Sequence, residues 1–417
     1  MRNVVILGGG FGGIRVALDL RRKLSTKEAA VTLIDRNSYH LFLPALYEIG
    51  SAYGIEPDRY NIKLRKAVCV PYPDIFENTG VNFIQAEVSH VDLSKKEITT
   101  NGDKVLSYDH LVFALGSETD TFNVPGADEY AFKFKTIDEA LFVNRRILEL
   151  YQKAAQGRHT LPIKFIIAGA GFNGIELAAE LACCVDNIKN ACKLHKNCVS
   201  IEIIEATPQI LPMISEKERA IIRTRLESLG IKIVENAPIK EVGPNFIKIG
   251  NEGKMFFADI IIWTAGARAS SFLKKVAGLH LDTRGRLEVN NYMRADCVEH
   301  VWALGDNAVF IDVGTKKPVP GLAYVAVDQA KIVAENIKRA IRGPSALREY
   351  QPFYELWIAP VGGKFAVAHL GKSLTFFGFW GWLLRMIVDF RYFLGVLPLS
   401  KALTIFEKEV YTFTKND

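Results

Sequence analysis

The sequence predicts an α/β fold made of two parallel-sheet domains, one inserted in the other, and an amphipathic C-terminal region. Two observations predict the domains. A strand, a glycine-rich turn and a helix occur in that order at the N-terminus and again in the middle of the chain. A further strand ending in Gly-Asp follows near residue 305, and a long aromatic-rich stretch near the C-terminus predicts the third region. With 417 residues, 49% of them hydrophobic, the chain can form two or three full-sized cores.

The first copy of the pattern begins with an apolar run over residues 4–7, which is typical of a buried parallel strand. The motif G-x-G-x-x-G follows over residues 8–13, and apolar residues at helical spacing predict a helix over residues 14–24. A second strand is expected over residues 31–34 and ends at Asp35. Together these segments form a βαβ unit, the context in which this glycine motif binds dinucleotides.

The turn needs glycine at three positions for different reasons. Gly8 allows a tight turn, Gly10 lets the backbone approach a pyrophosphate, and Gly13 lets the helix pack closely on the strand. The phosphates can then lie at the positive N-terminus of the helix. Asp35 can accept a hydrogen bond from a ribose hydroxyl. These residues predict a dinucleotide site.

The region between the two copies is expected to contain a cofactor loop and a small antiparallel layer. Residues 36–47 mix polar and aromatic side chains with one proline, which predicts either a loop and short helix near a bound cofactor or a loop packed on the core. Strand-like runs over residues 81–84, 97–100 and 104–106 predict a small hairpin layer. A strand over residues 108–116, stopped by glycine, is expected to return to the first sheet.

The second copy follows an expected helix over residues 137–155. Its strand, turn, helix and second strand are expected over residues 164–168, 169–174, 175–191 and 199–204, and the last strand ends at Glu205. Two complete motifs predict two dinucleotides. Glu205 can accept from a free ribose 2′-hydroxyl and would repel a 2′-phosphate, and residues 206–208 contain no arginine. The sequence therefore favours NADH over NADPH.

Two later strands are expected to complete the sheets. A strand over residues 260–263 closes the second domain, and Ala265 and Gly266 after it mark a close approach of the backbone to a ligand. A strand over residues 301–304 ends in Gly305 and Asp306, whose carboxylate can bind a polyol hydroxyl. The helix expected over residues 323–341 should point its N-terminus, at Ala323, toward the redox-active ring of the first cofactor.

Charge and cysteine usage exclude several functions. The net charge of +6 and pI near 8.8 are mildly basic, and no Lys/Arg-rich block with interleaved aromatic residues occurs, so nucleic acid is not expected as a partner. An anionic membrane surface or anionic cofactors fit better. The N-terminal apolar run is too short for a signal peptide, which predicts a cytosolic protein or one on the cytosolic membrane face. None of the six cysteines is spaced as C-x-x-C, so we expect no metal site.

The aromatic-rich stretch over residues 376–394 is long enough to span a bilayer, but its three charges, at about 2.5 to 3.5 kcal/mol each, argue against insertion. On a helical wheel one face is polar or small and the opposite face is apolar. The first carries Gly378, Gly381, Arg385, Asp389 and Tyr392, and the second Phe379, Leu383, Ile387, Phe390 and Leu394. This pattern predicts a helix in the membrane surface, or alternatively a core helix of a soluble dimer. Residues 401–410 predict a second short amphipathic helix.

These motifs together resemble the superfamily of pyridine nucleotide oxidoreductases that bind two dinucleotides, over about residues 1–340. The resemblance implies an FAD-binding Rossmann-like domain over residues 1–115 and 270–340, an inserted NADH-binding domain over 160–269, and a C-terminal domain over 341–417. The implied FAD-binding residues are Gly8, Gly10, Phe11, Gly12, Gly13, Asp35, Arg36, His40, Pro44, Ala114, Gly116, Gly305, Asp306 and Ala323. The implied NADH-binding residues are Gly169, Gly171, Phe172, Asn173, Gly174, Glu205, Ala265 and Gly266.

The absence of certain cysteines narrows the range of possible electron acceptors. Disulfide reductases of this superfamily need C-x-x-C or C-x-x-x-x-C beside the flavin, and neither spacing occurs. Sulfide:quinone oxidoreductases use cysteines in regions where this chain has none, over residues 70–182 and 298–417. With its tail, the chain resembles a type II NADH:quinone oxidoreductase. That implies a homodimeric respiratory enzyme, peripheral on the cytoplasmic face of the inner membrane, that passes electrons from NADH through FAD to a membrane quinone without pumping protons.

Three residues are candidates for the reaction itself. The family usually has A-Q-x-A-x-Q before the flavin-facing helix, whereas this chain has Tyr324 at the first glutamine and Gln329 one residue beyond the second. Tyr324 could donate to a quinone carbonyl, and Glu176 could lie near nicotinamide and flavin. Two alternatives remain open. One is an FAD enzyme with another donor, such as sulfide, and the other is a membrane-attached NADH sensor with a slowly reacting flavin.

Overall fold

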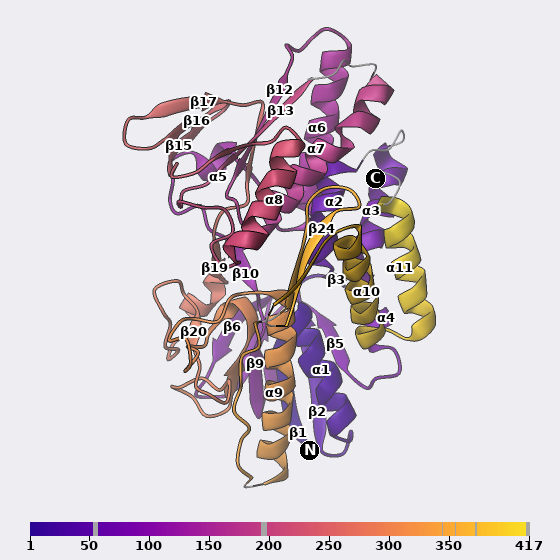
Figure 1. Ribbon diagram of the computed structural model, residues 1–417. Helices are drawn as coiled ribbons and strands as arrows, with labels where there is room; N and C mark the ends of the chain where they lie inside the picture. The colour runs from indigo at the N-terminus through magenta and orange to yellow at the C-terminus, as the bar shows by residue number, and fades with distance from the viewer. Residues whose placement is uncertain (53–56, 193–197, 344, 355, 372, 414–417) are drawn as a thin grey trace.

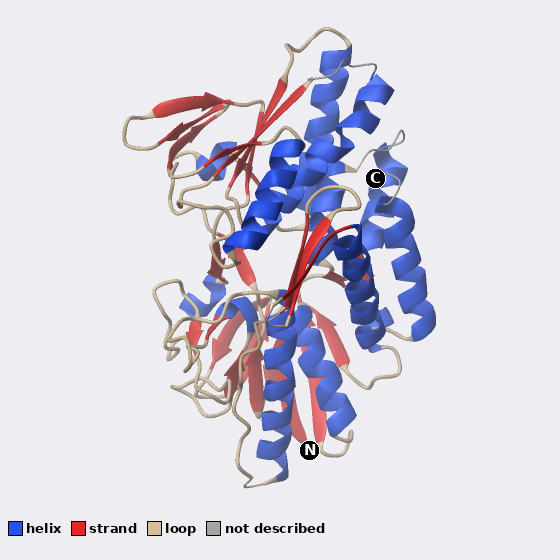
Figure 2. Cartoon of the chain, in the orientation of Figure 1, coloured by secondary structure: helices blue, strands red, loops and turns tan. Residues whose placement is uncertain are grey.

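The computed structural model describes residues 1–52, 57–192, 198–343, 345–354, 356–371 and 373–413. Two sheets of five parallel strands lie at the centres of two domains, one below the other in Figure 1, and helices cover them (Figure 2). Burial on both faces explains why the central strands are continuous apolar runs. The α/β class predicted from the sequence is confirmed.

The first sheet is built from two distant parts of the chain. Its strand order is β21-β9-β1-β2-β5, and its strands are β21 (Val301–Ala303), β9 (His110–Phe113), β1 (Arg2–Leu7), β2 (Ala29–Asp35) and β5 (Asn82–Gln85). Helices α1 (Phe11–Lys23) and α9 (Ala323–Arg342) pack side by side on it (Figure 1). Helix α1 begins three residues before the expected start, directly after the glycine turn, so its first backbone N–H groups face that turn.

The second sheet repeats this arrangement. Its strand order is β11-β18-β12-β13-β14, and its strands are β11 (Phe132–Lys133), β18 (Ile260–Trp263), β12 (Ile163–Ala168), β13 (Val199–Ile204) and β14 (Lys232–Val234). The domain's main helices are α6 (Ile137–Ala155), α7 (Phe172–Cys192) and α8 (Glu216–Ser228). Helix α6 has the predicted bounds because Thr136 and Glu139 form a reciprocal capping box at its start.

Smaller antiparallel sheets surround these domains. They are β3 (Tyr39–Leu41) with β4 (Cys69–Pro71), β6 (Val88–Asp92) with β7 (Glu97–Thr100) and β8 (Val105–Ser107), β10 (Ser117–Thr119) with β19 (Ala267–Ala269), and β15 (Ile239–Gly243) with β16 (Phe246–Ile249) and β17 (Lys254–Phe257). The prediction for residues 81–84 was wrong. This run joins the first parallel sheet beside β2 as strand β5, because its apolar residues pack on the main core, and β6 takes its place in the hairpin layer.

The C-terminal region fills the space beside both domains. It contains the sheet β23 (Leu356–Pro360), β24 (Ala366–Leu370) and β25 (Leu374–Gly378), followed by α10 (Phe379–Val396) and α11 (Leu399–Phe413) (Figure 1). The remaining short elements are α2 (Leu46–Ser51), α3 (Pro57–Val68), α4 (Tyr72–Phe76), α5 (Ala127–Tyr130), β20 (Leu287–Glu288), β22 (Ala308–Val309) and three 3-10 turns over Leu43–Ala45, Ser271–Lys275 and Gly305–Asn307.

Helix α10 turns its polar face inward. Arg385 and Asp389 are buried, whereas Trp380 and Ile387 are 66% and 55% exposed. A helix that buries charges and exposes large apolar side chains is the reverse of an ordinary surface helix. The polar face must therefore have partners inside the protein.

Candidate active site

The first glycine turn has the geometry of a cradle for phosphates. A Cβ atom on Gly13 would lie 1.9 Å from the carbonyl oxygen of Gly8, so only glycine allows this approach of helix to strand. A Cβ on Gly10 would meet nothing within 4 Å, so the backbone there faces open space in front of the N-terminus of α1. Open space in front of a helix N-terminus, where the first backbone N–H groups have no partner within the helix, fits a pyrophosphate.

Asp35 is held beside this turn by backbone donors. Its Oδ2 accepts from the Gly9 N–H at 2.7 Å, and its Oδ1 accepts from the Asn37 N–H at 2.8 Å. A carboxylate has about four lone-pair sites, so these bonds orient Asp35 and still leave capacity for a ribose hydroxyl.

The second glycine turn has the same arrangement. A Cβ on Gly174 would lie 2.0 Å from the Gly169 carbonyl oxygen, and a Cβ on Gly171 would meet nothing within 4 Å. The Ala170 N–H donates to Glu205 Oε2 at 2.7 Å, as Gly9 does to Asp35. Thr207 also holds Glu205, and sequence reasoning missed it. Its backbone N–H and its hydroxyl both donate to Glu205 Oε1 at 2.8 Å.

The strand-end motifs of β9 and β21 meet through residues that the sequence did not single out. Asn307 is fully buried, accepts from the Gly116 N–H at 3.0 Å and donates to the Phe113 carbonyl at 3.0 Å. Asp306 accepts from the hydroxyl of Ser117, which in turn accepts from the ammonium group of Lys135. Burial lowers the pKa of Lys135. A carboxylate and a hydroxyl at this edge fit a polyol, and Lys135 adds a positive charge.

Helix α9 presents Ala323, Tyr324 and Gln329 near this edge. Ala323 is the first residue of the helix. Burial raises the pKa of Tyr324 to about 12, with the charge of Asp328 adding to it, so its hydroxyl stays protonated and can donate. Gln329 is buried, and its Oε1 accepts from the Gly305 N–H at 2.7 Å. Gln329 therefore holds the turn that carries Asp306.

A hydrogen-bond chain joins the C-terminal region to the first glycine turn. His40 is buried, its Nδ1 lies 3.1 Å from the Gly9 carbonyl oxygen, and its Nε2 lies 2.7 Å from the Tyr392 hydroxyl of α10. A carbonyl can only accept, so Nδ1 donates to Gly9 and Nε2 accepts from Tyr392. Burial lowers the pKa of His40 to about 4, which keeps the ring neutral. Phe11 packs on both His40 and Tyr392, with ring centroids 4.9 and 4.8 Å away.

The Tyr392 contact leads to a prediction for retention of the FAD that the sequence analysis expects at this turn. Tyr392→Phe removes the donor to His40 and is expected to speed FAD release about 5- to 10-fold, the effect of one net hydrogen bond. The release rate is measured from flavin fluorescence after dilution. Tyr130→Phe, far from this turn, is the control and should release FAD as the wild type does. Equal rates in both variants would show that Tyr392 does not position the turn.

A cluster of buried charges lies where α10 meets the rest of the protein. Arg385 of α10 uses Nη2 to reach Glu48 Oε1 of α2 at 2.5 Å. Its Nε lies 3.3 Å from Asp389 Oδ2, and its Nη2 lies 4.0 Å from Glu409 Oε1 of α11. Tyr47 donates to Glu48 at 3.0 Å, and its ring lies under the guanidinium. Glu48 and Glu409 were missed by sequence reasoning. We refer to Arg385, Glu48, Asp389 and Glu409 as the Arg385 cluster.

Carboxylates outnumber cations in this cluster, so some of them hold a proton. Neither carboxylate oxygen of Glu409 has a hydrogen-bond partner among the described residues, and burial raises the pKa of Glu409 well above its usual value. Burial also raises the pKa of Asp389 to about 6. Glu176, the fifth residue of α7, feels the charges of Arg385, Asp389 and Glu48, and burial raises its pKa to about 8. Glu176 is therefore mostly protonated at neutral pH.

The other predicted residues lie around these groups. Arg36 and Asn173 are exposed, and Pro44 is partly buried in a 3-10 turn. The ring of Phe172 packs at a tilt of 48° against Trp357 of β23, with ring centroids 5.7 Å apart. A Cβ on Gly169 would lie 2.8 Å from Ala265, and a Cβ on Gly266 would lie 2.7 Å from the Asp120 carbonyl oxygen.

Metal and disulfide chemistry have no visible basis in the part of the chain that the structure describes. No group of three or more possible metal ligands occurs there. Cys69, Cys183, Cys198 and Cys297 form no disulfide. Cys184 and Cys192 lie in the cysteine-rich stretch that the sequence analysis noted, but their side chains are outside the described residues.

Comparisons with known proteins give a matching family model, similar curated proteins and solved structures with a similar fold. The sequence model of the pyridine nucleotide-disulphide oxidoreductase family matches residues 2–330. A type II NADH:quinone oxidoreductase of Staphylococcus aureus (strain NCTC 8325 / PS 47) is 29% identical over 351 residues, which is 82% of this chain and 84% of that protein. Among solved structures, NDH2 from Plasmodium falciparum in complex with NADH is similar, with TM-score 0.83, 19% identity and coverage of 99% and 98% of the two chains. The sulfide:quinone oxidoreductase of Aquifex aeolicus follows, with TM-score 0.77, 20% identity and coverage of 98% and 96%.

Proposed function

This chain belongs to the pyridine nucleotide-disulphide oxidoreductase family, and from that premise we propose that it is a flavoprotein that oxidises NADH and reduces a membrane quinone. The observation that carries the proposal is the pair of matched glycine turns, each with an acidic residue held by the backbone beside it. The similarity to a type II NADH:quinone oxidoreductase, which extends over 82% of the chain, supports the same activity. The other donors weighed from the sequence are not favoured.

The residues around the first turn fit FAD, and those around the second fit NADH. We assign FAD to Gly8, Gly10, Phe11, Gly12, Gly13, Asp35, Arg36, His40, Pro44, Ala114, Gly116, Gly305, Asp306 and Ala323. We assign NADH to Gly169, Gly171, Phe172, Asn173, Gly174, Glu205, Ala265 and Gly266. FAD, when bound, supplies two-electron chemistry between a hydride donor and a quinone. The domain division over residues 1–115 with 270–340, 160–269 and 341–417 belongs to the same proposal.

The protein residues contribute positioning and one proton. NADH brings a hydride, so reducing a quinone to a quinol consumes one further proton. Glu176 can supply it, because its raised pKa of about 8 keeps it protonated at neutral pH. Tyr324 can donate a hydrogen bond to a quinone carbonyl, and Gln329 holds the Gly305 turn in place. No cysteine lies in residues 70–182 or 298–417, so a thiol relay has no residues to use there.

Replacing Glu176 tests the proton step. Glu176→Gln keeps the shape but removes the proton donor, and kcat with quinone is expected to fall about 10²-fold with FAD content unchanged. The wild-type kcat should fall as pH rises above about 8, where Glu176 loses its proton, and the variant should lack that limb. Glu227→Gln, an exposed position on α8, is the control. An unchanged turnover and pH profile in Glu176→Gln would exclude this role.

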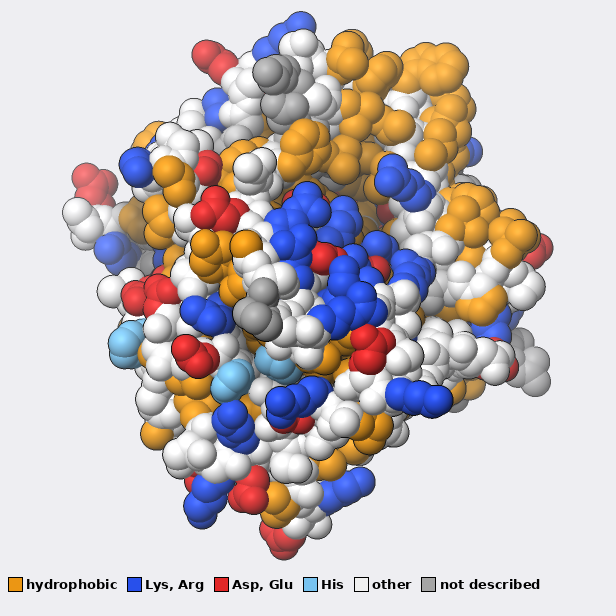
Figure 3. All heavy atoms as spheres, turned by 90° about the horizontal axis from the view of Figure 1, so that it is seen from below, with side chains coloured by type: hydrophobic (Ala, Val, Ile, Leu, Met, Phe, Trp, Pro, Cys, Tyr) orange, Lys and Arg blue, Asp and Glu red, His pale blue; other side chains and the backbone are white. Residues whose placement is uncertain are grey.

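We also propose attachment of the C-terminal region to the cytoplasmic face of the inner membrane, as a homodimer. None of the helices over the described residues combines the length and apolar character needed to cross a bilayer. Large apolar side chains are nevertheless exposed along this region, namely Phe376, Phe377, Phe379, Trp380, Ile387, Leu394, Leu399 and Leu403, each at least 40% exposed. Figure 3 shows hydrophobic side chains gathered along one side of the lower end. Such a patch fits the interfacial layer of a bilayer.

The proposed activity is tested by stopped-flow absorbance of the FAD-loaded protein, mixed first with NADH and then with a short-chain quinone. Fast bleaching of the flavin by NADH and fast recovery with quinone are the expected results. Bleaching without recovery would mean that quinone is not the acceptor. No bleaching would overturn NADH as the donor.

A further inference from the structure

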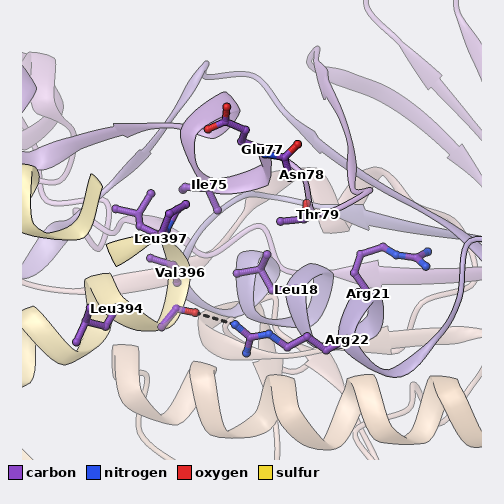
Figure 4. Close-up of a pocket in the computed structure, with 12 residues that line it drawn as sticks. Leu18, Arg21, Arg22, Ile75, Glu77, Asn78, Thr79, Leu394, Val396 and Leu397 are labelled. Atoms are coloured by element: carbon purple, nitrogen blue, oxygen red, sulfur yellow. Dashed lines mark hydrogen bonds between the residues drawn. The ribbon is translucent and has the colours of Figure 1, made fainter. Parts of the chain in front are cut away.

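One cavity lies outside both dinucleotide sites, at the lower end of the protein. It has a volume of about 380 Å³ and lies between the end of α1, the loop after α4 and the end of α10 (Figure 4). The glycine turn is at the other end of α1, which has 13 residues and is therefore about 20 Å long. This cavity cannot be part of the first dinucleotide site, and it faces the C-terminal end of the α1 dipole, where only side chains can supply positive charge.

Two arginines supply that charge. Arg21 is fixed in place because its guanidinium donates to the Ala29 and Leu24 carbonyls at 2.7 and 2.5 Å. Arg22 is held more loosely, since it donates to the Gly395 carbonyl at 3.3 Å and lies 3.5 Å from Asp19. A guanidinium has five N–H donors, and the side chain of Arg22 is 57% exposed, so it can also donate to a ligand in the cavity.

The acidic residue in the cavity wall, Glu77, is only partly compensated, because it shares one lysine with Asp74. Glu77 lies 2.5 Å from Lys401 of α11, which also binds Asp74 at 2.7 Å. The lining still has two arginines, Arg21 and Arg22, against one acidic residue, and this excess of positive charge favours an anion. The apolar part of the lining is formed by Leu18 and Ile75 and by residues 394–398 at the end of α10 (Figure 4).

The position of the cavity indicates which anion it binds. Leu394, at its rim, is 41% exposed and belongs to the apolar patch proposed above to contact the membrane. On the other side lie the basic last turns of α1 and α9, and Figure 3 shows Lys and Arg side chains gathered at this end beside the hydrophobic ones. In a phospholipid at a membrane surface, the headgroup phosphate lies between the apolar acyl layer and any basic protein surface that faces it. The surroundings of the cavity match this arrangement.

We propose that this cavity binds the phosphate headgroup of an anionic phospholipid, with Arg22 donating to the phosphate oxygens and residues 394–398 contacting the start of the acyl chains. Arg21, which is fixed on the Ala29 and Leu24 carbonyls, adds a second positive charge. This inference rests on the proposed membrane attachment and adds to it a preference for anionic lipid at one site.

The test measures binding of the full-length, FAD-loaded protein to vesicles of phosphatidylcholine alone and of phosphatidylcholine with phosphatidylglycerol, by co-sedimentation at constant ionic strength. Arg22→Gln is expected to lower the partition constant for the anionic vesicles about 20-fold or more, because it removes charge-assisted hydrogen bonds as well as charge. It should leave binding to phosphatidylcholine unchanged. Arg342→Gln, which removes an equally exposed charge of α9 outside the cavity, should cost no more than about fivefold.

The outcomes separate this inference from the attachment itself. Equal losses in the two variants would show a general electrostatic effect and overturn the headgroup site. Wild-type binding that is equally strong on neutral and anionic vesicles would also overturn it, while membrane attachment would stand. Binding to neither vesicle would refute the attachment. Calorimetric titration with inorganic phosphate should give no saturable binding, and tight binding of phosphate alone would assign the cavity to a soluble anion.

Discussion

Replacing Arg385 with methionine is expected to destabilise the protein by about 3 to 5 kcal/mol, the usual cost of removing one partner from a buried ion pair. Arg385 is the cation closest to Glu48, Asp389 and Glu409, all of which are buried. Without it, the buried carboxylate of Glu48 loses its ion-pair partner. Differential scanning calorimetry of the FAD-loaded protein measures the loss as a lower Tm.

Arg391→Met is the matched control, because Arg391 is exposed on the same helix. It should change stability by less than about 0.5 kcal/mol, as most surface substitutions do. An equal Tm for Arg385→Met and the wild type would mean that all the carboxylates of the Arg385 cluster are already neutral.

The pH dependence of stability tests the carboxylates of the Arg385 cluster, whereas the Arg385 variant tests its cation. Burial holds the pKa of Glu409 well above its usual 4.5, so the unfolded chain releases this proton at lower pH than the folded one. The contribution of Glu409 to stability is therefore present below about pH 4.5 and is lost as pH rises toward the folded-state pKa. Glu409→Gln has no proton to lose, so its Tm should exceed that of the wild type increasingly as pH rises. A constant Tm difference across pH would contradict this account.

Alanine at the third glycine of each turn should separate the two dinucleotide sites. Its Cβ would lie 1.9 Å from a carbonyl oxygen in Gly13→Ala and 2.0 Å in Gly174→Ala, so the helix must move away from the strand. Overpacking of this kind costs about 1 to 3 kcal/mol, which corresponds to roughly 10- to 100-fold weaker binding at a turn that must keep its shape. Gly13→Ala is expected to lose FAD during purification. Gly174→Ala should keep FAD. Because the same overpacking would weaken NADH binding, it should need roughly 10- to 100-fold more NADH for the same rate of flavin bleaching.

Gly314→Ala serves as the control for both variants, because its nearest neighbouring atom would be at an ordinary 3.5 Å. Flavin absorbance after purification and the NADH dependence of bleaching measure the two effects. Retention of FAD by Gly13→Ala together with loss of the NADH response would reverse the assignment of the two turns.

Local spacing was enough to predict both dinucleotide turns. Each needs only a strand, glycines at fixed offsets, a helix and an acidic residue at the end of the next strand, all within one βαβ unit. Helix α6 was also predicted with its observed bounds, and the structure shows a local reason for its start, the Thr136–Glu139 capping box. The run at residues 81–84 shows where this reasoning fails. An apolar run predicts a strand but not its partner, and tertiary packing placed it beside β2.

What the sequence by itself determined is therefore the pair of βαβ units, the acids beside their turns and the two faces of α10. Only the tertiary structure decided what the polar face of α10 contacts. Arg385 and Glu48 are 337 positions apart, and Tyr392 and His40 are 352 apart, so no local pattern encodes either pair. Burial gives these contacts their properties, because a protonated Glu176, a neutral His40 and a proton held at Glu409 all require the removal of water that folding alone provides.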